Sequence, residues 1–270
     1  MLFLAMHATF SATTASGRIL RVIGLGPGDQ ACLTPMAYQA LQEAQCIAGY
    51  SLYLDLLPPE LLRTKKRISS GMRGEQARCQ QAIDSALSGV PTALVCSGDP
   101  GVYALAGLVL ELLEAEDNLD ALDFSIVPGV PALCACAALL GAPLTHDFAC
   151  ISLSDLLTPW ERIEQRLHAA GMADFVLVLY NPRSKGRPDH LARAMTILKK
   201  YRSAECPVGL VRKAYRQGQS SEIVTLADFD VEKVDMLSLI IVGNSQSYQA
   251  GRYMLTPRGY HLDVAKAKTP

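Results

Sequence analysis

The chain has 270 residues, half of them hydrophobic and 19% charged, which suits two α/β domains with buried cores. Its formal net charge of −1 argues against a protein that binds nucleic acid or a membrane surface through bulk charge. No apolar stretch reaches the roughly 20 residues that a membrane-spanning helix requires, so no membrane span is expected.

The eight cysteines are scattered, and none forms a CxxC pair. Most lie within apolar runs, as reduced and buried thiols of a cytoplasmic protein do, and no protein metal site is expected. Residues 1–17 are apolar and then rich in Ser, Thr and Ala, without the basic start of a signal peptide. We therefore expect an N-terminal extension over 1–17.

The first predicted element is a short, β-branched, buried strand over 19–23. It leads into the glycine-rich loop 24–29, where glycine permits positive φ and close approach of a ligand, and Pro27 fixes its own φ. The loop could bind a ligand or serve only as a tight turn. It lacks the third glycine near Asp29 and the immediate helix of a Rossmann fingerprint, which excludes an NAD-dependent dehydrogenase, and it lacks the Gly-Lys-Ser/Thr of a P-loop.

Helices and strands alternate through the rest of the first half. We predict helices at 34–45, 75–88, 104–116 and 133–140, strands at 46–49, 92–96 and 124–127, and a polar loop at 69–74. Three strands end in loops rich in Gly and Pro, at 24–29, 97–103 and 128–132. Because ligands of open α/β sheets bind outside the carboxyl ends of the strands, these loops predict one shared ligand site, although each could also be merely a tight turn.

The second half is predicted to contain helices at 159–170 and 188–201 and strands at 150–153, 175–180, 208–212, 222–226 and 237–242. Residues 181–216 carry ten Lys and Arg against two Asp and Glu. Guanidinium groups in strand-end loops suit a polycarboxylate ligand, whereas the remaining charges suit solvated helix faces. The candidates for contact with such a substrate are Arg73, Arg183, Lys185 and Arg212.

Three segments in this order, GLGPGD, SGDPGVYA and PGVPA, resemble the tetrapyrrole methylases. These enzymes use S-adenosylmethionine (SAM) to methylate uroporphyrinogen and the precorrins. The resemblance runs from about residue 18 to about 248. It implies an α/β fold of two domains, 18–145 and 146–262, with SAM in the cleft between them, usually in a homodimer. This fold is not the Rossmann-like one of most methyltransferases.

Further segments, including LYNPRS at 179–184, LVRKA at 210–214 and IIVGNS at 240–245, are similar to one branch of that family. This branch methylates C17 of precorrin-3B and contracts the macrocycle. A cobalt-containing substrate, another precorrin carbon and a regulatory module that only binds an adenosyl ligand stay open as alternatives. A cobalt ion would be held by the macrocycle and not by the protein.

The resemblance carries the SAM contacts of the family onto ten positions of this chain. They are Pro27, Gly98, Asp99, Tyr103, Pro131, Ala132, Tyr180, Asn181, Ala214 and Gly243. Pro131 stands where several relatives have Thr, and it offers neither a hydroxyl nor an N–H group. The resemblance also implies that SAM is converted to S-adenosylhomocysteine when its methyl group is transferred.

Methyl transfer from a sulfonium needs alignment of donor and acceptor more than it needs a protein nucleophile. Ring contraction should nevertheless profit from an acid or a base near the macrocycle. The candidates for that role are His146, Asp147 and Asp99, although Asp99 suits loop orientation or SAM binding better. Ser97 is added to the catalytic candidates as a residue that could hydrogen-bond an acetate group of the ring. Histidine is the residue type most often used as an acid or base near neutral pH, but a single histidine at a domain junction more often has a structural role.

Overall fold

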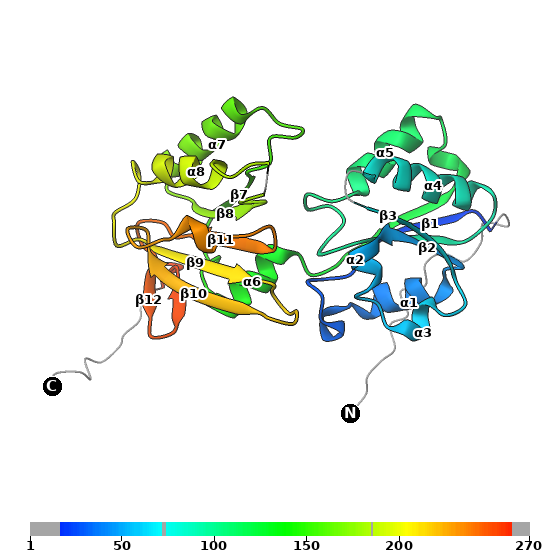
Figure 1. Ribbon diagram of the computed structural model, residues 1–270, viewed down its shortest axis with the longest axis horizontal. Coiled ribbons are helices and arrows are strands. Elements are labelled where there is room, and N and C mark those ends of the chain that lie inside the picture. The colour runs from blue at the N-terminus through cyan, green and yellow to red at the C-terminus, as the bar shows by residue number, and fades with distance from the viewer. Residues whose placement is uncertain (1–16, 72–73, 185, 261–270) are drawn as a thin grey trace. The chain divides into compact units, whose positions relative to one another are not determined.

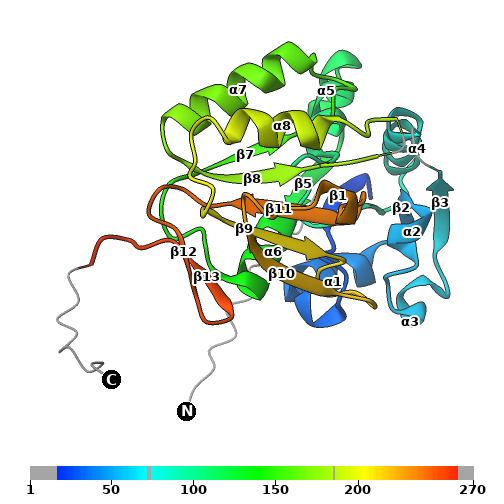
Figure 2. The ribbon, with the colours of Figure 1, turned by 60° about the vertical axis from the view of Figure 1, so that its left-hand side comes forward.

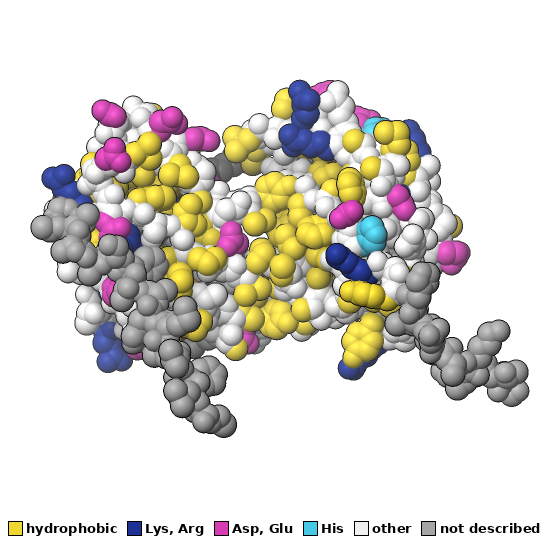
Figure 3. All heavy atoms as spheres, turned by 180° about the vertical axis from the view of Figure 1, so that it is seen from behind, with side chains coloured by type: hydrophobic (Ala, Val, Ile, Leu, Met, Phe, Trp, Pro, Cys, Tyr) yellow, Lys and Arg dark blue, Asp and Glu magenta, His cyan; other side chains and the backbone are white. Residues whose placement is uncertain are grey.

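The computed structural model describes residues 17–71, 74–184 and 186–260 (Figure 1). The chain divides into two compact units, 1–130 and 131–270, which are treated separately below. No helix in these described ranges is long and apolar enough to cross a membrane. On the face shown in Figure 3, acidic and basic side chains are scattered among abundant hydrophobic ones.

The first unit is built on a parallel sheet of five strands in the order β3-β2-β4-β1-β5. The strands are β1 (Ile19–Gly24), β2 (Cys46–Tyr50), β3 (Lys66–Ser70), β4 (Thr92–Cys96) and β5 (Asp123–Val127). Successive residues of β1 face opposite sides: Ile23 joins one core cluster, and Val22 joins another. Burial on both faces explains why the central strands are almost continuously apolar.

Helices cover both faces of this sheet. One core cluster joins it to α1 (Pro35–Glu43), α2 (Ser51–Leu54) and α3 (Pro59–Leu62). The other joins it to α4 (Glu75–Leu87) and α5 (Ala106–Ala115). Two short 3-10 helices, η1 (Gln30–Cys32) and η2 (Leu119–Ala121), complete the unit. The start of α1 is as its sequence indicates, since the Thr34 hydroxyl accepts the Ala37 amide at 3.1 Å and Pro35 follows.

The strand β3 was not expected, because the sequence around it is polar and Ser69 and Ser70 were assigned to a loop. The strand lies at the edge of the sheet and pairs only with β2. Its Lys66 and Arg67 are exposed. An edge strand in contact with water needs no apolar pattern, and charged residues there discourage pairing with other chains.

The second unit contains a mixed sheet of five strands in the order β10-β9-β11-β8-β7 (Figure 2). The strands are β7 (Phe148–Ser152), β8 (Val176–Tyr180), β9 (Pro207–Arg212), β10 (Ser220–Thr225) and β11 (Ser238–Val242). Only β7 and β8 are parallel; β11 runs antiparallel to β8 and β9, and β10 runs antiparallel to β9.

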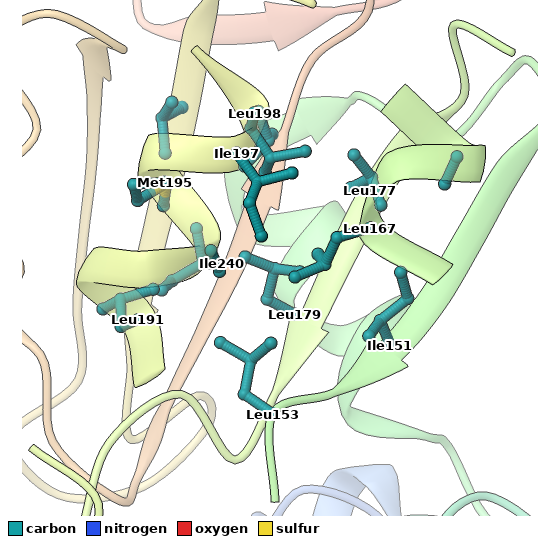
Figure 4. Close-up of a cluster of buried hydrophobic side chains, with 14 of the residues drawn as sticks. Ile151, Leu153, Leu167, Leu177, Leu179, Leu191, Met195, Ile197, Leu198 and Ile240 are labelled. Atoms are coloured by element: carbon teal, nitrogen blue, oxygen red, sulfur yellow. The ribbon is translucent and has the colours of Figure 1, made fainter. Parts of the chain in front are cut away.

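Helices α7 (Trp160–Met172) and α8 (His190–Leu198) cover one face of this sheet, and α6 (Ala132–Leu140) covers the other. Leu167, Leu177, Leu179 and Ile240 meet in the cluster under α7 and α8 (Figure 4). A small sheet of β6 (Gly141–Ala142), β12 (Tyr248–Ala250) and β13 (Tyr253–Leu255) and the 3-10 helix η3 (Val231–Lys233) complete the unit.

Helix α6 belongs to the second unit, although the predicted domain boundary at 145/146 assigned its residues to the first. Leu140 and Cys136 pack with buried residues of β8, β9 and β11. The approach to β9 is so close that a Cβ atom on Gly209 would lie 2.4 Å from Leu140 Cδ1. The absence of a side chain at Gly209 of β9 therefore lets Leu140 of α6 pack directly on the second sheet.

Candidate functional site

The loops that follow β4, β1 and β5 are neighbours, because these three strands are adjacent in the first sheet. We call the segments 24–29, 97–101 and 128–130 the glycine edge. Gly26 and Gly98 exchange two backbone hydrogen bonds, with N–O distances of 3.1 and 2.7 Å. The Leu25 amide donates to the Cys96 carbonyl at 2.8 Å. The predicted convergence of the three loops is thus present at the carboxyl end of one sheet.

Three glycines fix the spacing of the glycine edge. A Cβ atom on Gly24 would lie 2.6 Å from the Gly98 carbonyl oxygen and 2.7 Å from the Gly129 nitrogen. A Cβ atom on Gly129 would lie only 2.2 Å from the same Gly98 oxygen. Real Cβ atoms do not approach backbone this closely, so side chains are excluded here by the contact of the loops with one another.

Asp99 connects two of these loops through both oxygens of its carboxylate. Oδ1 accepts the Gly101 amide at 2.8 Å, and Oδ2 accepts the Gly129 amide at 3.1 Å. The first bond shapes the loop after β4, and the second ties it to the loop after β5. Asp99, expected among the SAM contacts, is therefore at least an organiser of the glycine edge.

Other predicted residues lie in or beside the same loops. Pro27 is buried and Ser97 is partly buried. Tyr103 has a φ of 52° and is 53% exposed. A residue other than glycine with positive φ is uncommon and tends to occur where the surrounding structure holds a functional loop in shape. An exposed aromatic ring beside side-chain-free loops suits contact with a planar ligand.

The second unit places a comparable set at one end of its own sheet. We call Ser152, Tyr180, Asn181, Arg212 and Ala214 the tyrosine edge. Ser152 pairs with Tyr180 across β7 and β8, and Arg212 pairs with Ser238 at the corresponding end of β9 and β11. Ala132, Tyr180 and Ala214, three of the predicted SAM contacts, pack against one hydrophobic cluster.

The Tyr180 hydroxyl accepts the Leu133 amide at 2.9 Å. This amide belongs to the first turn of α6, where Pro131 precedes the helix and offers no capping side chain. Burial raises the pKa of Tyr180 well above its ordinary value, so the hydroxyl stays neutral. Tyr180 thus satisfies one of the helix-end N–H groups that would otherwise lack a partner.

Arg187 holds the two loops of the tyrosine edge together, a role that the sequence analysis missed. Its Nη1 donates to the Leu153 and Asn181 carbonyl oxygens, both at 3.3 Å. Asn181 itself has a φ of 50°, and its side-chain amide donates to Ser152 Oγ at 2.9 Å. The only sequence signal was the position of Arg187 in the basic loop after β8.

The two predicted substrate arginines that the structure describes are paired with carboxylates of the chain itself. Arg183 Nη2 lies 2.7 Å from Glu232 Oε2, and Nη1 donates to the Val231 carbonyl at 3.0 Å. Arg212 Nη2 lies 2.7 Å from Asp235 Oδ2. Both arginines thus contact residues 231–235, and their predicted contact with a substrate stays a prediction. Arg73 and Lys185 lie outside the described residues.

The pairing of Arg212 with Asp235 should make the folding stability of the protein depend on pH in a testable way. Burial alone would raise the pKa of Asp235, but hydrogen bonds from Arg212 and Ser238 outweigh it and hold the pKa below the ordinary 3.8. A depressed folded-state pKa stabilises the protein above the unfolded-state pKa and loses this contribution as pH falls through the folded-state pKa.

We therefore expect Asp235→Asn to be less stable than the wild type at pH 7, and the difference in unfolding free energy to shrink as pH falls through the lowered folded-state pKa of Asp235. Urea unfolding across this range measures the difference. Asp189→Asn is the control, because the Asp189 side chain makes no capping bond. A gap between wild type and Asp235→Asn that does not change with pH would contradict the assignment.

Three predicted residues do not lie at the tyrosine edge. His146 and Asp147 precede β7 and are exposed at its amino end, where the Asp147 carbonyl accepts the Val176 amide. Gly243 follows β11, which is antiparallel to β8, so it also lies at the opposite end of the sheet. There its carbonyl accepts Arg202 Nε at 3.0 Å. The sequence pattern located these strands but did not give their direction.

In the described part of the chain, no group of three or more His, Cys, Asp or Glu side chains could hold a metal ion. The two edges offer instead backbone groups, tyrosines, hydroxyls and an amide. These are groups that bind and orient an organic ligand. The fold and its edges thus define an α/β protein whose glycine-rich loops follow the carboxyl ends of its parallel strands, the position at which open α/β sheets generally bind ligands.

Comparison with known proteins identifies the family. Residues 20–230 match the family model of the Tetrapyrrole (Corrin/Porphyrin) Methylases. The chain therefore belongs to the tetrapyrrole methylase family, which confirms the resemblance seen in its sequence.

Individual relatives agree with this membership. A protein of Salmonella typhimurium named probable cobalt-factor III C(17)-methyltransferase is 51% identical over 244 residues, which cover 90% of this chain and all of that protein. A precorrin-3B C(17)-methyltransferase of Sinorhizobium sp is 39% identical over 247 residues, covering 89% and 96%. The crystal structure of the methyltransferase CobJ matches with a TM-score of 0.85 at 37% identity, covering 88% of this chain and 99% of that one. The predicted fold class is confirmed by this last match.

Proposed function

We propose that this protein is a SAM-dependent methyltransferase of corrin-ring synthesis that methylates C17 of its tetrapyrrole substrate. The observation that carries the proposal is the glycine edge, where three loops of a chain of this family meet closely at glycines and are held together by backbone hydrogen bonds and the Asp99 carboxylate. The 51% identity to the cobalt-factor III enzyme exceeds the 39% identity to the precorrin-3B enzyme. This difference favours a cobalt-containing substrate. The first expectation from the sequence was metal-free precorrin-3B.

The residues of this chain suit binding and alignment. We propose that four residues of the first unit contact SAM: Pro27, Gly98, Asp99 and Tyr103. We propose the same role for five residues of the second unit: Pro131, Ala132, Tyr180, Asn181 and Ala214. SAM, when bound, supplies a methyl group on a sulfonium, from which an electron-rich ring carbon can take it. The loops then have to hold donor and acceptor in line and exclude water, and rigid, hydrogen-bonded loops serve that purpose.

Two further properties follow from family membership as proposals. We propose that the protein is a homodimer and that it acts in the cytoplasm. Light scattering coupled to size-exclusion chromatography tests the first of these, with a mass near twice the 29.1 kDa of the chain expected. A monomer at micromolar concentration would contradict it.

The proposed activity is tested by two successive measurements. Calorimetry with S-adenosylhomocysteine should show binding at low micromolar affinity or tighter, near one molecule per chain. Incubation with methyl-labelled SAM and either cobalt-factor III or precorrin-3B, followed by NMR of the product, should place the label at C17. Label at another carbon would assign a different ring methylation, and binding without transfer to either substrate would point to an adenosyl-binding module.

A further inference from the structure

Four arginines of the described chain are buried. Their exposed fractions are 8% for Arg21, 4% for Arg78, 9% for Arg187 and 7% for Arg202. A guanidinium group is always charged at neutral pH, and burying it is costly unless a carboxylate and hydrogen-bond acceptors surround it. The surroundings of these four side chains can therefore be compared directly.

Three of the four have a carboxylate nearby. Arg21 pairs with Asp123 at 2.6 Å. Arg202 lies 3.2 Å from Asp174 and also donates to several carbonyl groups. Arg187 lies 4.0 Å from an oxygen of Asp155 and donates to two carbonyl groups. Each of these charges is thus compensated within the protein.

Arg78, which has the lowest whole-residue exposure of the four, is different. Among the described residues its one hydrogen bond runs from Nη1 to Ser70 Oγ, at 2.5 Å. Its Nε is buried with no hydrogen-bond partner. No ion pair within 4.0 Å involves it in the described ranges. The edge of the guanidinium formed by Nε and Nη2 is therefore unpaired, and this edge is one that a carboxylate binds with two parallel hydrogen bonds.

The other ionisable groups close to Arg78 do not neutralise it. Arg78 acts electrostatically on the thiols of Cys79 and Cys96. Burial is the main cause that raises the pKa of Cys79 to about 12 and that of Cys96 to about 11. Both thiols stay neutral at pH 7. The carboxylates of Glu75 and Asp99 act electrostatically on the same thiols. In the described ranges neither forms an ion pair with Arg78 within 4.0 Å, so the guanidinium has no carboxylate in direct contact.

Arg78 also lies at the carboxyl end of the first sheet. Ser70 is the last residue of β3, and Cys96 is the last residue of β4 and pairs with Gly24 of the glycine edge. Arg78 belongs to the first turns of α4, a helix whose N-cap residue, Gly74, makes no side-chain cap. Helical side chains incline toward the N-terminus, so the guanidinium adds its charge to the positive end of the helix dipole.

We propose that Arg78, supported by Ser70, binds a carboxylate group of a ligand at this end of the first sheet. The inference rests on the proposed function, which offers two sources of that group: the amino-acid carboxylate of SAM and an acetate or propionate side chain of the tetrapyrrole. The carboxylate accepts from Nε and Nη2 while Ser70 keeps Nη1 in place. An unpaired buried charge is unfavourable without ligand and becomes favourable once the anion arrives.

The test compares wild type with Arg78→Met and with Arg63→Met, an exposed arginine in the same unit. Removing an uncompensated charge should leave the melting temperature of the ligand-free protein unchanged or raise it. Sodium acetate, compared with chloride at equal ionic strength, should raise the melting temperature of wild type and Arg63→Met but not of Arg78→Met. This arm tests carboxylate binding even if the proposed activity fails.

The source of the carboxylate follows from ligand affinities. If it is SAM, Arg78→Met should bind S-adenosylhomocysteine about 10- to 100-fold more weakly, but should bind 5′-methylthioadenosine, which lacks the carboxylate, as wild type does. If the carboxylate belongs to the tetrapyrrole, Arg78→Met should bind S-adenosylhomocysteine as wild type does. Its KM for cobalt-factor III should instead rise by a similar factor. Arg78→Lys keeps the positive charge but cannot donate two parallel hydrogen bonds to a carboxylate. Its affinity for the ligand concerned should lie between those of wild type and Arg78→Met.

Two outcomes would overturn the inference. One is a lower melting temperature of Arg78→Met with unchanged affinity for every ligand, which would make Arg78 a structural residue. The other is equal stabilisation of Arg78→Met and wild type by acetate. A wild-type protein that is stabilised by acetate through Arg78 but binds neither S-adenosylhomocysteine nor a tetrapyrrole would instead sink the proposed function alone.

Discussion

Gly129→Ala should destabilise the first unit by about 3 kcal/mol or more and weaken S-adenosylhomocysteine binding with it. The added Cβ atom would lie 2.2 Å from the Gly98 carbonyl oxygen and 2.8 Å from Gly24 Cα. Both contacts are to backbone, so no rotamer change relieves them. The loop after β5 has to move away from the other two, and the glycine edge loses its shape.

Urea unfolding and calorimetry measure the two effects. Gly107→Ala is the matched control, because Gly107 lies in α5 and an added Cβ would meet nothing within 4 Å. There the substitution should be neutral or stabilising by up to about 1 kcal/mol, since alanine favours a helix over glycine. Equal unfolding curves for Gly129→Ala and Gly107→Ala would show that the three loops are not held in contact.

The loops of the glycine edge could be predicted because the conformational preferences of their residues are visible in the sequence. Apolar runs indicate the buried strands, and the glycines and prolines after them indicate where each strand ends. The interlock itself could not be predicted, because it depends on which strands are neighbours. Nothing local in the sequence states that β1 lies between β4 and β5.

The second unit shows two features that the sequence pattern did not predict: the direction of a strand and the partners of charged residues. The residues of β11 were recognised as a strand, but its antiparallel direction moves Gly243 away from Tyr180. Strand direction is set by connections and packing, not by the alternation of side chains. The basic segment was likewise recognised, but the acidic partners of Arg183 and Arg212 come from residues 232–235, some 20 to 50 positions later.

Buried polar groups were the hardest to foresee. In the sequence Arg78 looks like an ordinary surface residue of a helix, and Arg187 is one of several basic residues in a strand-end loop. Their importance comes from burial and from the presence or absence of partners. Arg78 is 4% exposed, has no carboxylate beside it in the described residues, and its Nε has no hydrogen-bond partner. Arg187 is 9% exposed and donates to two carbonyl oxygens. Such roles become visible only when hydrogen bonds and charges are assigned pair by pair.

Asp99→Asn should cost about 1–3 kcal/mol of stability, although the two side chains have nearly the same shape. The carboxylate accepts the Gly101 amide on one oxygen and the Gly129 amide on the other. Asparagine has one acceptor oxygen, and its NH₂ group would face one of these two donors. One loop contact is lost whichever way the amide is turned.

Asp29→Asn is the control, because within the described ranges the Asp29 carboxylate accepts one hydrogen bond, from the Ala31 amide to Oδ1 at 2.8 Å, and an asparagine oxygen can do the same. We expect it to leave stability and S-adenosylhomocysteine affinity unchanged. If Asp99 acts by holding the loops, affinity in Asp99→Asn should fall together with stability, and amide exchange at Gly129 should speed up. A loss of affinity at unchanged stability and exchange would show instead that the Asp99 carboxylate contacts the ligand itself, and the bonds to Gly101 and Gly129 would then be secondary to that contact.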